Sequence, residues 1–172
     1  MSNERFSLGP VSKFNSNAIG KPGQRTFRLL IESDIGSACL WLEKQQLLEL
    51  SLLLRQLLRD YFQGNDISVN PNLTSLSEIA QVNPTIEFTI AQLNVNFDDS
   101  THLWVMEAYD SDDSVGNDPT LNVEIQSDVL LGFVDEALAI CSAGRPLCPL
   151  CGNPINEGVN HVCPLKNGHI KH

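Results

Sequence analysis

Cysteine and histidine residues gather near the C-terminus in a pattern typical of a metal site. Cys148 and Cys151 form a Cys-x-x-Cys pair, and His161 and Cys163 follow ten and twelve residues after Cys151. Such a pair supplies two thiolates from one tight turn, which is the usual first half of a structural zinc site. The second half must come from the third cysteine and the histidines that follow.

Two histidines could complete a tetrahedral set of three sulfur ligands and one nitrogen ligand. His161 and Cys163 are separated by one residue, so their side chains share one side of an extended segment, and we predict His161 as the fourth ligand. His169 is the alternative fourth ligand. Four protein ligands leave no open coordination position, so the predicted Zn²⁺ is structural rather than catalytic.

A redox centre or incidental surface cysteines could also explain the pair. Redox Cys-x-x-Cys motifs lie between a strand and a helix, whereas proline-rich turns surround this one. The zinc interpretation is favoured because the tail has too few apolar side chains to order roughly 25 residues by burial alone. A structural zinc ion contributes an apparent binding free energy of about 10–16 kcal/mol to such a fold.

Hydrophobic periodicity divides the rest of the chain into two similar halves, each with strands followed by a helix. The predicted fold is α+β, with two β-β-β-α-like halves sharing one antiparallel sheet, two helices packed on it, and a zinc-knuckle or ribbon-like tail. We expect an α+β domain over 1–143 and a small zinc-binding module over 144–172. Residues 5–16 are predicted to form one or two strands, and further strands are predicted at 26–32, 38–43, 88–97, 102–109 and 121–126. The first predicted helix is 44–62, and the second follows Ser127 and is closed by Gly144.

Local residue types predict two further details of these elements. Ser127 is a good N-cap for the second helix, and Asp128 falls in the first turn, where negative charge suits the helix dipole. Residues 64–84 are polar and rich in turn formers, so they are expected to form a surface connection.

The formal net charge of −10 in 172 residues is unevenly distributed. Residues 31–143 carry a net charge of −16, whereas 1–30 carry +4 and 144–172 carry +2. So acidic a body repels phosphate backbones, which argues against nucleic-acid binding. No apolar run reaches the roughly 20 residues of a membrane helix, and no secretion segment follows the N-terminus. We therefore expect a cytoplasmic protein that does not enter membranes and whose thiols stay reduced.

A second, weaker candidate site would bind a protein partner or a small anionic ligand. Residues 43–46, which belong to this site, lie where a strand becomes a helix. A solvated first helical turn would explain the polar residues at these positions more simply. An enzyme acting on a small anionic substrate would need a deep pocket lined by Arg25, Glu43 and Lys44. The full candidate set is Arg25, Arg28, Glu43, Lys44, Gln45 and Gln46.

Four blocks of sequence, at 20–27, 43–46, 144–152 and 161–168, carry a family resemblance. Together and in this order they resemble the DUF3090 family of uncharacterised bacterial proteins, most of them actinobacterial. The chain departs from the family pattern in a 151–161 loop that is one residue longer. The resemblance implies no known activity, but it implies a shared pathway with a kinase-like protein and a histidine-phosphatase-like protein.

These observations predict a non-enzymatic, zinc-stabilised binding or adaptor module with a protein partner. The alternative is an enzyme acting on a small anionic substrate, and nucleic-acid binding is the third and least favoured hypothesis.

Overall fold

The computed structural model describes 5–21, 23–64, 85–113, 118–144, 148–151, 153, 155 and 160–165 of the chain. Its regular elements follow the predicted order of strands and helices closely. They are β1 (Phe6–Ile19), β2 (Thr26–Ser33), β3 (Gly36–Leu42), α1 (Lys44–Gly64), β4 (Ile86–Asp98), β5 (Leu103–Asp110), β6 (Leu121–Ile125) and α2 (Ser127–Ser142).

The strands form because apolar residues alternate with polar ones, so each strand has one face for the core. In β2 the side chains of Phe27, Leu29 and Ile31 are buried, while their neighbours are only half-buried. The register places these residues opposite Leu42, Leu40 and Ala38 of β3, which gives one continuous apolar inner surface.

The six strands form a closed barrel in which they follow one another in chain order. Within each half the strands are antiparallel, whereas the halves join through two parallel pairs, β3 with β4 and β1 with β6. The predicted α+β fold with two β-β-β-α halves and two helices is confirmed. The sheet differs from a wholly antiparallel one because α1 returns the chain from the end of β3 to the start of β4, which makes these two strands parallel.

The two longest strands, β1 and β4, close the barrel. Each pairs with one neighbour along its first part and with another neighbour along its second part. The first part of β1 pairs with β6 and the second with β2, with register shifts at Ser7/Gly9 and Val11/Lys13. Likewise β4 passes from β3 to β5 and has a register shift at Ile90/Gln92. Such bulges bend a strand strongly, and Gly9 has the positive φ of 60° that one of them requires.

Helix α1 presents leucines at three- and four-residue steps to the core, as the periodicity predicts. Leu47, Leu54 and Leu58 are almost fully buried. At its N-terminus, the side-chain oxygen of Gln46 accepts a hydrogen bond from the Glu43 backbone N–H at 2.8 Å, which is half of a capping box. The predicted helix is confirmed and ends at Gly64.

Helix α2 packs on β1 and on α1, and its start differs from the predicted one. Gln126 occupies the N-cap position without a side-chain hydrogen bond, so the prediction of Ser127 as the cap is wrong. The Ser127 hydroxyl instead accepts a hydrogen bond from the Trp104 indole N–H at 2.9 Å. Further along, the rings of Phe133 and Phe14 lie 4.5 Å apart in an edge-on contact.

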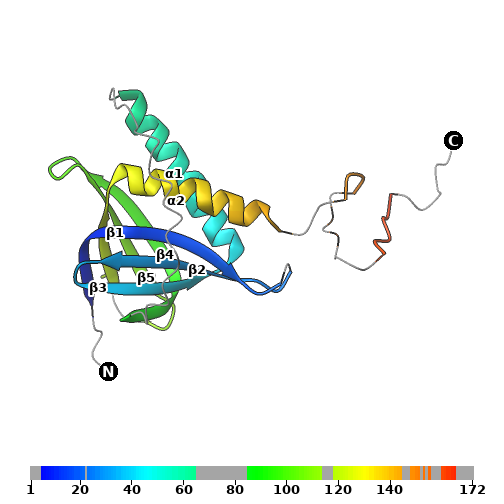
Figure 1. Cartoon of the computed structure of the whole chain (residues 1–172), viewed down its shortest axis with the longest axis horizontal. Coiled ribbons are helices and arrows are strands. Elements are labelled where there is room, and N and C mark those ends of the chain that lie inside the picture. Colours follow the sequence, from blue (N-terminus) through cyan, green and yellow to red (C-terminus); the bar gives the residue numbers. More distant parts are fainter. Residues whose placement is uncertain are drawn as a thin grey trace.

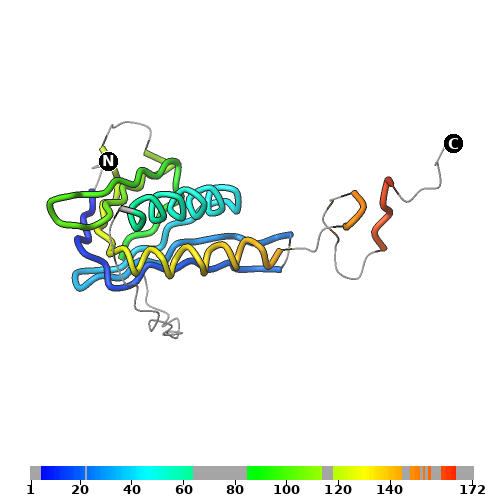
Figure 2. Tube along the Cα trace, turned by 90° about the horizontal axis from the view of Figure 1, so that it is seen from above, coloured from blue at the N-terminus to red at the C-terminus, as the bar shows by residue number. Residues whose placement is uncertain are grey.

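Both helices lie on one side of the barrel, where they contact each other (Figures 1 and 2). The described C-terminal residues lie beyond the end of α2 (Figure 1). None of the described helices has the length and apolar content needed to cross a membrane. The predicted connection at 64–84 falls, after Gly64, outside the described residues.

Candidate metal centre

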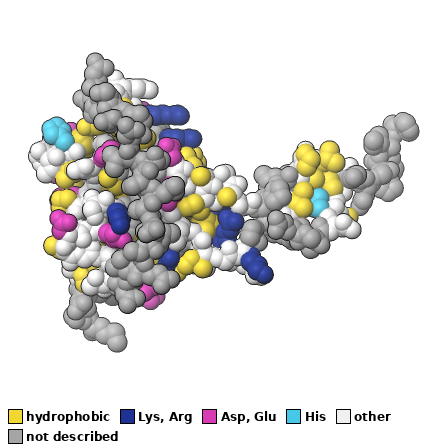
Figure 3. Space-filling view, viewed as in Figure 1, with side chains coloured by type: hydrophobic (Ala, Val, Ile, Leu, Met, Phe, Trp, Pro, Cys, Tyr) yellow, Lys and Arg dark blue, Asp and Glu magenta, His cyan; other side chains and the backbone are white. Residues whose placement is uncertain are grey.

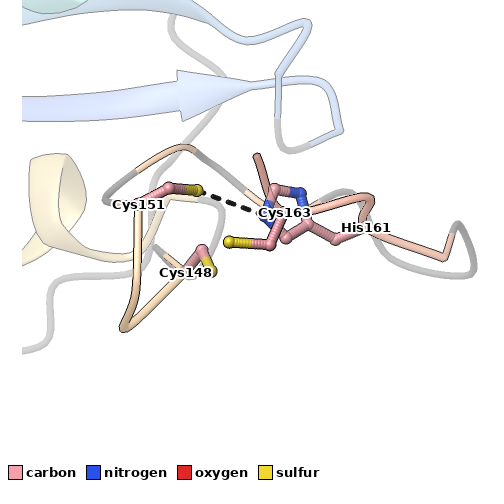
Figure 4. Close-up of side chains that lie close together, drawn as sticks. All are labelled: Cys148, Cys151, His161 and Cys163. Atoms are coloured by element: carbon pink, nitrogen blue, oxygen red, sulfur yellow. Dashed lines mark hydrogen bonds between the residues drawn. The ribbon is translucent and has the colours of Figure 1, made fainter. Parts of the chain in front are cut away.

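Four side chains from two short segments meet in the C-terminal part of the chain. Cys148 and Cys151 come from one turn, and His161 and Cys163 come from an extended segment that folds back beside it (Figure 4). Their potential ligand atoms all lie within 4.8 Å of one another. Cys148 and Cys163 are buried, whereas the other two are partly exposed.

Backbone hydrogen bonds organise the turn that carries the first two cysteines. The Cys148 N–H donates to the Asn153 carbonyl at 2.8 Å, which closes the turn on itself. The backbone N–H groups of Cys151 and Leu150 point at the Cys148 sulfur and, with smaller contributions from the neighbouring thiols, lower the pKa of Cys148 to about 6. The turn therefore stabilises a thiolate before any metal binds.

The pKa of Cys151, the second cysteine of the pair, is shifted in the opposite direction. The Asn153 N–H lowers the pKa of the Cys151 thiol, but burial and the adjacent Cys148 and Cys163 sulfurs outweigh it, so that the pKa is raised overall. The Cys151 sulfur also lies 3.4 Å from the His161 Nε2 atom. Several thiolates crowded in one place repel one another, and a bound dication would remove this repulsion.

The geometry of the four donors fits a tetrahedral metal ion. A zinc ion with sulfur ligands at about 2.3 Å places those sulfurs roughly 3.8 Å apart. The observed cluster is within about an ångström of this arrangement, so small side-chain movements would suffice to complete it. Three soft sulfur donors and one imidazole nitrogen are the ligand types that zinc prefers.

The four predicted ligands are therefore the residues that the structure brings together. His169, the alternative fourth ligand, lies outside the described residues. The remaining cysteines, Cys39 and Cys141, are buried in the body and form no disulfide. Burial raises the pKa of both thiols.

A family model described as "Protein of unknown function (DUF3090)" matches residues 6–163. The chain belongs to this family. The match runs from the first strand to the last of the four potential ligands, so the resemblance of the sequence blocks is confirmed. Neither the search of curated proteins nor the search of solved structures found a match.

In this DUF3090 member, the predicted binding residues Arg25 and Arg28 belong to the region around β2. Arg28 lies on the outer face of the barrel, where its Nε donates to the Asn17 side-chain oxygen at 2.7 Å. Its guanidinium carbon is 5.7 Å from the centre of the Trp41 ring. Arg28 therefore joins three strands across the outer surface. Arg25 precedes β2 and is partly buried.

The 43–46 stretch has a local structural role in the DUF3090 fold. Gln46 accepts the hydrogen bond at the start of α1, and Gln45 donates to the Glu49 carboxylate at 2.8 Å. The Lys44 Nζ atom lies near the end of α2, since a Cβ added at Gly144 would lie 2.8 Å from it. The two cavities described below are lined by neither Arg25 nor Glu43.

Exposed apolar side chains lie beside the potential metal ligands, and they were not among the predicted site residues. Leu150, Val162 and Leu165 are 56%, 74% and 70% exposed. Figure 3 shows hydrophobic atoms gathered next to the histidine of this segment. A signal was present, because Leu150 and Val162 each stand between two ligands, where a closed metal site directs side chains outward.

Proposed function

We propose that this protein is a non-enzymatic interaction module whose C-terminal segment is ordered by one structural zinc ion. The observation that carries the proposal is a closed set of three sulfur donors and one nitrogen donor beside exposed apolar side chains. With all four positions filled by protein, the ion would have no site for water or substrate. Its role would be to stabilise the segment.

The bound metal would give this segment a surface suited to a protein partner. Leu150 precedes the ligand Cys151, and Val162 lies between His161 and Cys163, so binding of the ion fixes the backbone from which both side chains project. Apolar side chains clustered on an otherwise polar surface mark interaction sites. The family resemblance makes kinase-like and histidine-phosphatase-like proteins the first partners to test.

The experiment compares zinc content and partner capture for the tagged full chain and three variants in extracts of the native host. Val162→Asp places a charge on the proposed surface. Ile35→Asp is the matched control, because Ile35 is 73% exposed but lies in the turn between β2 and β3. Cys151→Ser removes one ligand. We expect about one zinc per chain in all samples except Cys151→Ser.

The captured partner should be the same for wild type and Ile35→Asp and absent for Val162→Asp and Cys151→Ser. Stoichiometric zinc in Cys151→Ser would refute the ligand assignment. Zinc-loaded wild type that recovers no partner, or a Val162→Asp variant that captures as well as wild type, would refute the interaction surface.

A further inference from the structure

A groove with an apolar floor runs along the contact between α1 and α2. It consists of two cavities of about 350 Å³ and 530 Å³, and Arg55 lines both of them. Leu58, Phe62 and Leu131 contribute apolar surface at one end. Leu48 and Leu138 contribute it at the other. We call this feature the α1–α2 groove and define it by the residues that line the two cavities.

Three of the eight basic residues of 1–143 line this groove, and they are all the basic residues of the acidic region 31–143. Residues 31–143 contain 19 acidic residues but only three basic ones, Lys44, Arg55 and Arg59. All three line the α1–α2 groove. The ion pairs found among the described residues, Arg5–Asp118 and Lys13–Glu32, leave these three cations out.

No carboxylate of the two helices lines either cavity. Asp135 is on the same side of α2 as Leu131 and Leu138, by the helical repeat, but it lines neither cavity. Glu49 of α1 also lines neither cavity, and its carboxylate accepts a hydrogen bond from Gln45. In Figure 3, lysine and arginine atoms lie beside hydrophobic atoms on the part of the body that carries the helices. The groove is therefore apolar at its base and cationic at its rim.

The dimensions of the groove suit a helix. From Lys44 to Phe62 the lining of α1 extends over 18 residue steps, which is roughly 27 Å at 1.5 Å per residue. An amphipathic helix of about five turns would cover this length with its apolar side. Acidic residues on the flanks of such a helix would face Arg55 and Arg59.

Other occupants fit the charges less well. Two copies of the chain packed groove to groove would place Lys44, Arg55 and Arg59 opposite the same cations, because a twofold interface brings like surfaces together. A nucleic acid or an anionic membrane would extend past the groove over the acidic remainder of the body, where it would be repelled.

We propose that the α1–α2 groove binds an amphipathic helix of a partner protein whose polar flanks carry Asp and Glu. The proposal rests on the proposed interaction function, but it does not require the zinc ion. It assigns a docking surface on the body that is separate from the exposed residues of the C-terminal segment.

The test uses the full chain as purified and a synthetic, fluorescently labelled 18-residue peptide, and fluorescence anisotropy measures the binding. The peptide has leucines at helical spacing and glutamates on both flanks. One control peptide replaces each glutamate with lysine, and a second scrambles the sequence to remove the helical spacing. We expect saturable binding of the acidic amphipathic peptide and much weaker binding of both controls.

Charge reversal then locates the site on the protein. Arg55→Glu/Arg59→Glu should weaken binding of the acidic peptide by about tenfold or more, because two cations facing the peptide become repulsive. Lys21→Glu/Arg25→Glu changes the net charge equally but lies outside the groove. It should weaken binding much less, because neither residue lines the groove and so neither would contact the bound peptide directly.

Several results would overturn the proposal. These are no binding of the acidic peptide, equal binding of either control peptide, or equal losses in the two charge-reversed variants. Self-association of the chain that Arg55→Glu/Arg59→Glu abolishes would make a second copy the occupant. Zinc content measured on the same samples separates the two proposals: peptide binding without zinc refutes the zinc-stabilised module alone, and zinc without peptide binding refutes the groove alone.

Discussion

The body and the C-terminal segment of this protein bury different kinds of side chain. In the body, buried apolar side chains from all six strands and both helices form one core cluster. In the described part of the C-terminal segment, the buried side chains are Cys148 and Cys163, and both belong to the potential metal site. Leu150, Val162 and Leu165 of that segment face solvent instead. The difference supports the proposal that the body is stabilised by an apolar core and the C-terminal segment by metal ligation.

The largest effect is expected from a cavity in the body. Leu54→Ala removes a side chain that is 1% exposed and should lower the free energy of unfolding by about 2–5 kcal/mol. Leu53→Ala is the adjacent control, because Leu53 is 49% exposed, and should cost less than about 1 kcal/mol. Urea unfolding measures both values. The proposal that metal ligation orders the C-terminal segment independently of the body predicts that both variants retain zinc, and loss of zinc in Leu54→Ala would contradict it.

A smaller effect is expected from one half-buried carboxyl group of the body, that of Glu136. Burial raises the pKa of Glu136 above its usual value of 4.5, and hydrogen bonds from Ser16 and Asn15 only partly offset this. The folded state therefore holds the Glu136 proton more tightly than the unfolded state, and stability decreases as the pH rises from about 4.5 through the raised pKa.

Glu136→Gln removes this dependence and keeps an oxygen that can accept the Ser16 N–H. The variant should match wild type near pH 4 and be more stable at pH 7, as measured by urea unfolding at both values. A variant that is less stable than wild type at pH 7 would show that the charged hydrogen bond outweighs the cost of burial.

Much of the fold could be predicted because it depends on local patterns. The alternation of β2 and the leucine spacing of α1 each depend on neighbouring residues, and so does the Cys-x-x-Cys turn. Closure of the barrel could not be predicted in this way. It depends on the parallel pairing of β1 with β6, between residues far apart in the sequence, and on bulges whose positions depend on that pairing.

Features that depend on a second element were also missed. Ser127 has the residue type of a cap, but the Trp104 indole, brought close by the fold, uses its hydroxyl. The basic residues of the groove share one side of α1, and their spacing is visible in the sequence. The surface of α2 that faces them could not be predicted, because it depends on how the two helices pack. The grouping of Arg25 and Arg28 with the 43–46 stretch as a binding surface stays a prediction.

The most direct test of the account is hydrogen exchange of the full chain, measured by mass spectrometry before and after removal of metal with a chelator. The account predicts faster exchange in peptides covering 148–165 and unchanged protection in the strands and helices of 6–142. Unchanged exchange at 148–165, or loss of protection spreading through the barrel, would contradict the claim that metal ligation orders only the C-terminal segment.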